Sequence, residues 1–155
     1  MLDISLLDKR VIGFLEKYSW QKGRKVDVSK WIDQLTKEGY ICFPYAVEIL
    51  EELGGIDVRP ERVKIGESFP GDFDFHAFNA GSGELDIMEF YKPIAGENLF
   101  PLGMVYGQWF LYVGLSKKIY MGGGDKFYLL GENIEEFLNN IIMGTKKPIA
   151  LHKEG

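Results

Sequence analysis

The chain has 155 residues, of which 46% are hydrophobic and 14% aromatic, and its net charge is −5. This hydrophobic content excludes a disordered protein, and the length is that of one domain. The acidic balance argues against nucleic acid as a direct partner, because phosphate binding needs clustered Lys and Arg. We therefore expect a single domain over residues 1–155, with residues 145–155 as a loose tail.

The cysteine usage and the hydropathy bear on the compartment. Cys42 is the only cysteine, so no intramolecular disulfide can form, which fits a reducing compartment. Its neighbours Ile41 and Phe43 predict a buried structural thiol. The first residues lack a basic stretch followed by an apolar core, and no run approaches the roughly 20 apolar residues of a membrane span. We expect a cytoplasmic protein with no membrane partner.

Apolar residues recur at the helical period through the first third of the chain. They predict helices over 4–17, 29–38 and 44–53. Asp27 is a candidate N-cap of the second helix, and Gly39 stands where a left-handed residue ends a helix. Pro44 suits the first turn of the third helix, because its φ is already helical and it has no N–H to leave unpaired.

After residue 55 the pattern changes to that of short strands. The candidates are 56–58, 63–65, 73–78 and 85–91, with a turn over 79–83 and a loop over 93–99. Phe73 and Phe75 alternate with Asp74 and His76, which is the period of a half-buried strand. We expect the strand over 85–91 to pair back onto this one.

The last third predicts more strands and a closing helix. The run over 109–113 does not alternate, so we expect a central strand covered on both faces. Strands over 118–121 and 127–130 follow, separated by a turn at the glycines 122–124. Asn133 and Glu136 form a capping box for a helix that ends at Gly144.

The order of these elements is helices, then strands, then one helix. Such an order predicts an α+β fold instead of alternating α/β units. We expect a mostly antiparallel sheet of about six strands, with the N-terminal helices and the C-terminal helix packed against it.

Residues able to carry chemistry are few and scattered. His76 and His152 are far apart and lack the spacing of metal ligands. The glycines 122–124 are not followed by Gly-Lys-Ser/Thr, and Gly81-Ser82-Gly83 lacks the frame of a nucleophile elbow. We interpret both stretches as turns and predict no catalytic set, no metal site and no cofactor.

Acidic residues gather in and beside the two predicted strands between 72 and 91. They are Asp72, Asp74, Glu84, Asp86 and Glu89. Three interpretations remain open: a solvated sheet face, an anionic docking patch for a basic partner, or two carboxylates in a cleft that do acid–base or metal chemistry. Trp20 lies in a break between helices and is expected to be partly exposed, so it joins these five as a candidate partner-binding residue.

Short motifs run in a fixed order through nearly the whole chain. They are Trp20 to Asp27, Gly39-Tyr40, the helix to Leu53-Gly54-Gly55-Ile56, Phe73 to Ala77, Pro101-Leu102-Gly103, Trp109 to Val113, Ile119-Tyr120, Leu130-Gly131 and the helix ending at Gly144. In this order they resemble the SUKH superfamily, which has a Smi/Knr-like fold, and more specifically its third subfamily of bacterial immunity proteins. The chain departs from that pattern in the turns near Lys117 and Gly122.

The resemblance implies an α+β fold and a non-enzymatic role. Such proteins are encoded beside polymorphic toxins, often nucleases or deaminases, and bind the toxin domain to protect the producing cell. The implied partner is thus a cognate toxin domain, expected to be basic, which an acidic surface would steer into contact. We expect a monomer or a weak homodimer. The alternatives are a general interaction or regulatory module of the Smi/Knr type that binds a cytosolic partner, and an enzyme that uses the carboxylates over 72–89.

Overall fold

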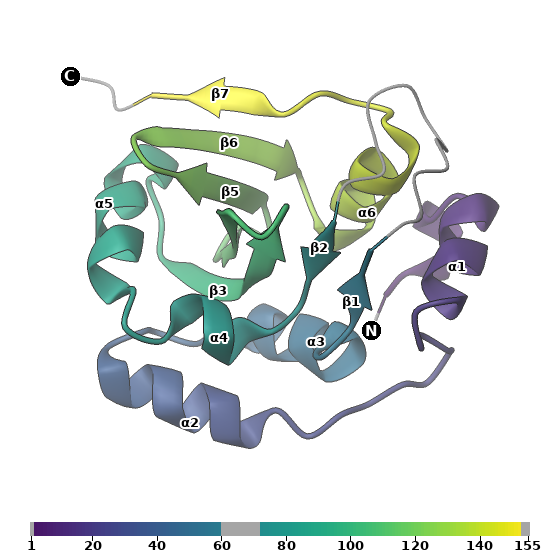
Figure 1. Ribbon diagram of the computed structural model, residues 1–155, viewed down its shortest axis with the longest axis horizontal. Helices are drawn as coiled ribbons and strands as arrows, with labels where there is room; N and C mark the ends of the chain where they lie inside the picture. The colour runs from purple at the N-terminus through teal and green to yellow at the C-terminus, as the bar shows by residue number, and fades with distance from the viewer. Residues whose placement is uncertain (1, 60–71, 153–155) are drawn as a thin grey trace.

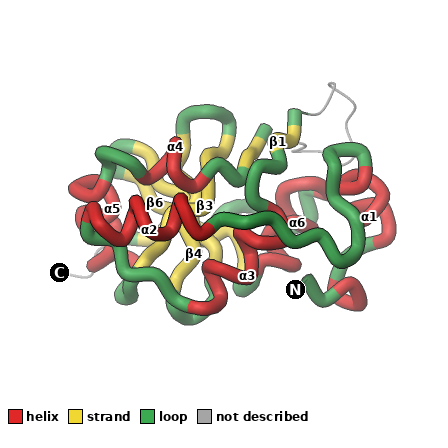
Figure 2. Tube along the Cα trace, turned by 90° about the horizontal axis from the view of Figure 1, so that it is seen from below, coloured by secondary structure: helices red, strands yellow, loops and turns green. Residues whose placement is uncertain are grey.

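The computed structural model describes residues 2–59 and 72–152, and in these residues the protein is α+β (Figure 1). Seven strands form one antiparallel sheet whose spatial order is the chain order, β1 to β7. Helices stand at both ends of it, and α1 and α5 lie at opposite ends of the molecule in both views (Figures 1 and 2). The predicted fold class is confirmed, with seven strands in place of about six.

The first three helices form where the apolar period places them. They are α1 (Lys9–Glu16), α2 (Ser29–Glu38) and α3 (Pro44–Leu53), and a 3₁₀ turn over Ile4–Leu6 precedes α1. The first predicted helix is therefore shorter than 4–17, because Asp8 caps α1 by accepting a hydrogen bond from the N–H of Arg10. Gly39 ends α2 with φ 116°, as predicted.

The N-cap of α2 is Val28 and not Asp27. Asp27 still acts on the same turn, because its carboxylate accepts hydrogen bonds from the N–H of Ser29 (3.0 Å) and from its hydroxyl (2.7 Å). The cap prediction is thus wrong by one position, although the side chain that serves the helix start is the one expected.

The largest correction concerns residues 75–95. Strand β2 is only Phe73–Asp74, and two helices follow it, α4 (Ala77–Gly81) and α5 (Leu85–Ala95), where a turn and a strand over 85–91 were predicted. The side chain of Asp74 ends the strand by accepting the N–H of His76. The predicted loop over 93–99 is also wrong at its start, since Pro93 lies inside α5.

The strands run from one edge of the sheet to the other. They are β1 (Asp57–Val58), β2, β3 (Leu99–Val105), β4 (Trp109–Gly114), β5 (Ile119–Gly123), β6 (Lys126–Gly131) and β7 (Ile149–Leu151). The predicted strand over 63–65 lies outside the described residues. The stretch after Gly144 is not wholly a loose tail, because Ala150 pairs with Tyr128 and β7 extends the sheet.

Strand β4 is central and covered on both faces, as its unbroken apolar run predicts. Helix α5 covers one face: Tyr91 lies 5.9 Å from the Tyr112 ring and stacks on Phe127 at 5.0 Å. Gly122 belongs to β5 and not to the predicted turn, and a Cβ there would lie 2.5 Å from the Tyr91 ring. The close approach of Tyr91 to the sheet therefore requires glycine at this position.

The closing helix α6 (Ile134–Met143) packs along β6 at the other side of the sheet (Figure 1). Asn133 caps it by accepting the N–H of Glu136 at 2.8 Å, and Gly144 ends it with φ 66°, as predicted. Phe137 of this helix meets Phe73 of β2 edge to face, with ring centroids 5.8 Å apart. The core is thus continuous from the first strands to the last helix.

Candidate partner-binding surface

The structure divides the predicted acidic patch into two separate groups. Asp72 and Asp74 lie at β2, whose neighbours in the sheet are β1 and β3. Glu84 immediately precedes α5, and Asp86 and Glu89 lie on this helix, which is not part of the sheet. The five carboxylates therefore do not share a strand face, and each group has to be judged by its own contacts.

Asp74 has a structural task that limits its use in binding. Its Oδ1 accepts hydrogen bonds from the N–H of His76 (3.0 Å) and of Met104 (3.3 Å), which joins β2 to β3. A Cβ on Gly103 would lie 1.9 Å from the backbone oxygen of Asp74, so the two strands are in very close contact here. Burial raises the pKa of Asp74, and the charge of Asp57 adds to the rise. This carboxylate is occupied by backbone N–H groups and is therefore less available to a partner.

Asp57, the neighbour of Asp74 on β1, contacts a guanidinium and an imidazole. Asp57 stands opposite Asp74 in the register, and Oδ1 of Asp57 lies 3.0 Å from Nε of Arg59. Nε2 of His76 lies 3.9 Å from Oδ2 of Asp57. Exposed pairs of this kind contribute about 0–1 kcal/mol each. The region is mixed in charge, and exposed Asp72 is its one carboxylate without an ion pair or side-chain hydrogen bond among the described residues.

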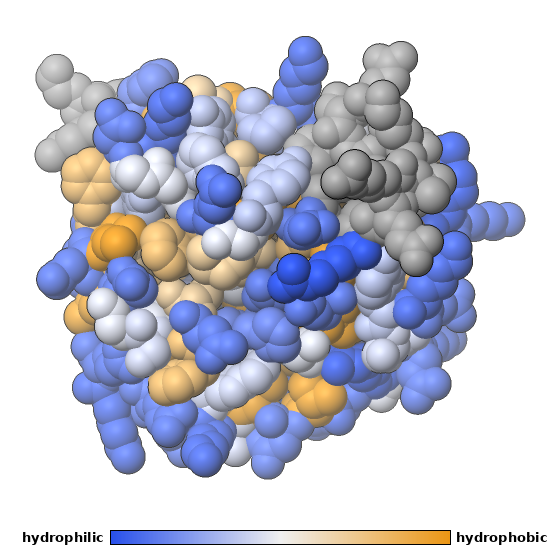
Figure 3. Space-filling view, viewed as in Figure 1, coloured by the Kyte–Doolittle hydropathy of each residue, from blue (hydrophilic) through white to orange (hydrophobic). Residues whose placement is uncertain are grey.

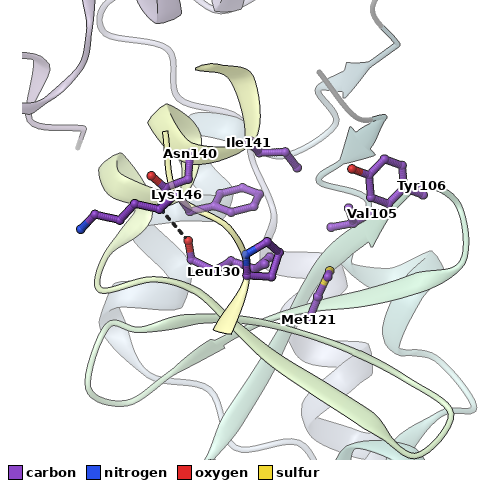
Figure 4. Close-up of a pocket in the computed structure, with 9 residues that line it drawn as sticks. Val105, Tyr106, Met121, Leu130, Asn140, Ile141 and Lys146 are labelled. Atoms are coloured by element: carbon purple, nitrogen blue, oxygen red, sulfur yellow. Dashed lines mark hydrogen bonds between the residues drawn. The ribbon is translucent and has the colours of Figure 1, made fainter. Parts of the chain in front are cut away.

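An apolar hollow lies beyond this region, between the sheet and α6 (Figure 4). It is lined by Val105, Tyr106, Met121, Leu130, Phe137, Asn140, Ile141, Lys146 and Pro148, and its volume, open solvent included, is about 310 Å³. The amide of Asn140 donates to the backbone oxygen of Leu130 at 2.9 Å and so is satisfied internally. Without the open solvent its free volume is only about 20 Å³, far below the roughly 300–1,000 Å³ of ligand pockets, so it has no room for a cofactor.

Two members of the second acidic group, Asp86 and Glu89, belong to the exposed face of α5. Asp86, Glu89, Phe90 and Pro93 have the spacing i, i+3, i+4 and i+7, which places them on one side of α5. All four are exposed, whereas Met88 and Tyr91 on the other side are buried. Neither Asp86 nor Glu89 has an ion pair or a side-chain hydrogen bond among the described residues. Their carboxylates are therefore available to a partner.

A second, open hollow adjoins this helix face. Its lining residues are Glu89, Lys92, Pro93, Gly96, Glu97, Asn98 and Leu115. Glu97 is engaged, because its carboxylate accepts the N–H and the hydroxyl of Ser116, each at 2.6 Å, and thereby holds the turn between β4 and β5. That turn presents Leu115, which is 60% exposed. Phe90 and Leu115 are exposed apolar residues that the sequence interpretation missed, although the spacing 86, 89, 90 and 93 was a signal for the first.

Trp20 is not exposed, contrary to expectation. Only 4% of it is accessible, and its indole Nε1 donates to Oε2 of Glu52 at 3.1 Å. A buried tryptophan needs such a partner for its N–H. Trp20 therefore belongs to the core in this structure and offers a partner almost no surface.

Other predicted features have plain structural explanations. Cys42 is half-buried, and burial raises the pKa of its thiol, which disfavours the reactive thiolate. No group of three or more His, Cys, Asp or Glu within residues 2–59 and 72–152 could hold a metal ion. None of the helices in that part of the chain is long and apolar enough to cross a bilayer.

The sequence model described as SUKH-3 immunity protein matches residues 7–144. The chain belongs to this family. No curated protein and no solved structure gives a significant match. The matched region extends from Leu7, two residues before α1, to the glycine that ends α6, so it includes both acidic groups and leaves β7 outside.

Several residues that carry the resemblance to the SUKH-3 family are structural. Arg24 donates to the backbone oxygens of Glu52 (2.6 Å) and Gly54 (2.9 Å), where α3 ends. The hydroxyl of Tyr40 donates to the backbone oxygen of Gly81 at 2.7 Å, which fastens α4 to the chain after α2. These motifs maintain the scaffold, so the surface that recognises a partner has to be sought elsewhere on the molecule.

Proposed function

We propose that this SUKH-3 protein binds a cognate toxin domain and neutralises it by direct contact. The family match over residues 7–144 carries the proposal, because an immunity protein has a protein partner. Exposed carboxylates without internal partners, next to exposed apolar side chains, support recognition of a protein surface. Covering the toxin's active site, or holding the toxin in an inactive conformation, is sufficient for neutralisation and needs no catalytic group in this chain.

The expected toxin is a nuclease or a deaminase that acts on nucleic acid. A domain that binds phosphates presents clustered Lys and Arg, so an acidic protein is attracted to it at long range. The net charge of −5 supports such steering. We expect the encounter to occur in the cytoplasm, with the immunity protein as a monomer or a weak homodimer.

The enzymatic alternative depended on two carboxylates in one cleft. The acidic residues over 72–89 are divided between β2 and α5, and Asp74 is occupied by two backbone N–H groups. The geometry on which that alternative rested is therefore missing from the described residues, and we propose a non-enzymatic role.

Cells that express the toxin domain encoded by the neighbouring gene provide the direct test. Co-expression of this chain should restore their growth, and the purified proteins should form a complex in isothermal titration calorimetry. A family member that recognises a different toxin is the matched control and should restore nothing. Absence of both rescue and binding would contradict the proposal and favour a general interaction module of the Smi/Knr type.

A further inference from the structure

The exposed side of α5 carries a large aromatic residue that is only partly packed against the fold. Phe90 is 53% exposed, and its ring touches Tyr91 with centroids 5.5 Å apart while Tyr91 itself faces the core. Leu115 lies next to the same helix, at the hollow that Glu89 and Pro93 line. Apolar residues reach the surface on the side of α5 in the space-filling view (Figure 3). Exposed aromatic residues within a polar rim are typical anchors of protein interfaces.

The same side of α5 is rich in hydrogen-bond acceptors. Pro93 has no N–H, so the carbonyl of Glu89, four residues earlier, lacks its usual donor within the helix. The carboxylates of Glu89 and Asp86 stand on the same side without internal partners in the described residues. Guanidinium and ammonium groups are donors only, and carboxylates are their strongest acceptors. The chemistry of this side therefore fits Arg and Lys side chains of a partner.

Charge is distributed unevenly along the molecule and favours the α5 end for such a partner. Residues 84–98 contain four acidic residues and one lysine, and the turn that presents Leu115 adds Lys117 and Lys118, so this end keeps a small excess of acidic residues. Residues 2–25, around α1 at the opposite end (Figure 1), contain six Lys or Arg and three acidic residues. A basic protein is thus attracted to one end and repelled by the other, which orients it before contact.

We propose that the α5 surface, defined as Asp86, Glu89, Phe90, Pro93 and Leu115, is where the basic toxin domain docks. Phe90 and Leu115 supply the apolar contact, and Arg or Lys side chains of the toxin bind the carboxylates of Asp86 and Glu89. This inference rests on the proposed function. It favours α5 over the β2 group, in which Asp74 is occupied and Asp57 is already paired with Arg59.

Four single substitutions in the full-length chain test this surface against purified toxin domain encoded by the neighbouring gene. Glu89→Lys is matched by Glu16→Lys on α1, since both glutamates are exposed on helices. Phe90→Ala is matched by Leu6→Ala, a residue that is 52% exposed at the α1 end. We expect Glu89→Lys to weaken binding about tenfold and Phe90→Ala about thirtyfold, the size of an interface anchor. Both controls should stay within about threefold of wild type.

Salt dependence separates steering from a general loss of structure. The association rate of the wild type should fall as ionic strength rises, and that dependence should be weaker for Glu89→Lys than for Glu16→Lys. Thermal unfolding should show all four variants folded. Wild-type binding that none of the four substitutions changes would overturn the α5 surface and leave the proposed function standing. A wild type that does not bind the toxin domain at all would overturn both.

Discussion

Nε1 of Trp20 and Oε2 of Glu52 form a 3.1 Å hydrogen bond in the interior of the protein. The other oxygen of Glu52 accepts the N–H of Leu2 at 2.7 Å, so one buried carboxylate holds both the start of the chain and the segment between α1 and α2. The backbone oxygen of the same residue accepts from Arg24. Trp20 and Arg24, both in the stretch that resembles the family, thus contact the same residue in this chain.

Replacement of Glu52 should therefore destabilise the fold strongly. Glu52→Ala leaves the N–H groups of Trp20 and Leu2 buried without acceptors, at a cost of about 1–3 kcal/mol for each. The neighbouring Glu51→Ala removes only a loose pair with Lys25 at 3.8 Å and should cost less than about 1 kcal/mol. Urea unfolding followed by tryptophan fluorescence measures both. Equal effects of the two substitutions would show that the buried carboxylate is not the anchor.

Tyr112 provides a prediction of the opposite sign. It is 1% exposed, and its hydroxyl has no hydrogen-bond partner among the described residues. Burial raises the pKa of this hydroxyl, so it stays neutral over the accessible pH range. Removing an unsatisfied buried polar group relieves its desolvation penalty, so Tyr112→Phe should raise the free energy of unfolding by about 1 kcal/mol.

Tyr40→Phe is the control for Tyr112→Phe, because it deletes the same hydroxyl from a second buried tyrosine. In Tyr40 the hydroxyl donates to the backbone oxygen of Gly81, and its loss should lower stability by about 1 kcal/mol. Thermal denaturation measures the change in stability of each variant relative to the wild type. A loss of stability in Tyr112→Phe equal to that in Tyr40→Phe would mean that the Tyr112 hydroxyl has a partner in solution.

Asp74 should make the stability of the folded state depend on pH. Burial raises its pKa in the folded state above the unfolded value. Between these two pKa values the folded state binds more protons than the unfolded one, so stability falls as pH rises through that window. Asp74→Asn keeps an oxygen for the N–H groups of His76 and Met104 but removes the charge.

The stability of the Asp74→Asn variant should consequently not fall as pH rises through the two pKa values of Asp74. The variant should be more stable than the wild type only at pH values above both of them. The gain should be below about 1 kcal/mol, because the side chain is partly exposed and solvent screens it. Chemical unfolding at a series of pH values from acid to neutral compares the two proteins, with exposed Asp72→Asn as the control. Parallel pH profiles for wild type and Asp74→Asn would contradict the assignment.

The sequence predicts those elements whose signals are local. Gly39 predicts the C-terminus of α2, and Pro44 and Asn133 predict the N-termini of α3 and α6. Each of these residues acts within one turn of its own helix. Helix α5 escapes this reasoning because Leu85, Ile87 and Tyr91 also fit a two-residue period. Its helical state is stabilised by distant contacts, such as the Tyr91 hydroxyl on the backbone oxygen of Gly124 at 2.8 Å.

Of the proposed α5 surface, Asp86 and Glu89 were named from the sequence but grouped with the carboxylates at β2. Each carboxylate over 72–89 was identified, yet their grouping depended on a strand pairing that does not form. The burial of Trp20 could not be inferred from the sequence, because Glu52, which accepts its N–H, lies 32 residues further along the chain. Phe90 was overlooked because residues 85–91 were predicted as a strand, in which the helical spacing of Asp86, Glu89 and Phe90 has no meaning.

Strand β7 is the short edge strand of the sheet, and its removal should make the longer strand β6 the new edge. Phe127 of β6 is 1% exposed and stands opposite Leu151 in the register. Truncation after Pro148 removes three strand residues and leaves the backbone of β6 unpaired, a common starting point for edge-to-edge association. We expect this variant to lose about 2 kcal/mol of stability, the transfer energy of the partly buried Leu151 side chain together with the ladder hydrogen bonds of β7.

Truncation after His152 is the matched control, because it keeps β7 whole. Size-exclusion chromatography at increasing protein concentration should show association only of the shorter variant, since its exposed edge is the six-residue strand β6 in place of the three-residue strand β7. Chemical unfolding should show the loss of stability in the same variant. If both truncated proteins remained as stable and as dispersed as the full chain, β7 would be a dispensable addition to the sheet. This outcome would fit the family match, which ends at residue 144, before the strand begins.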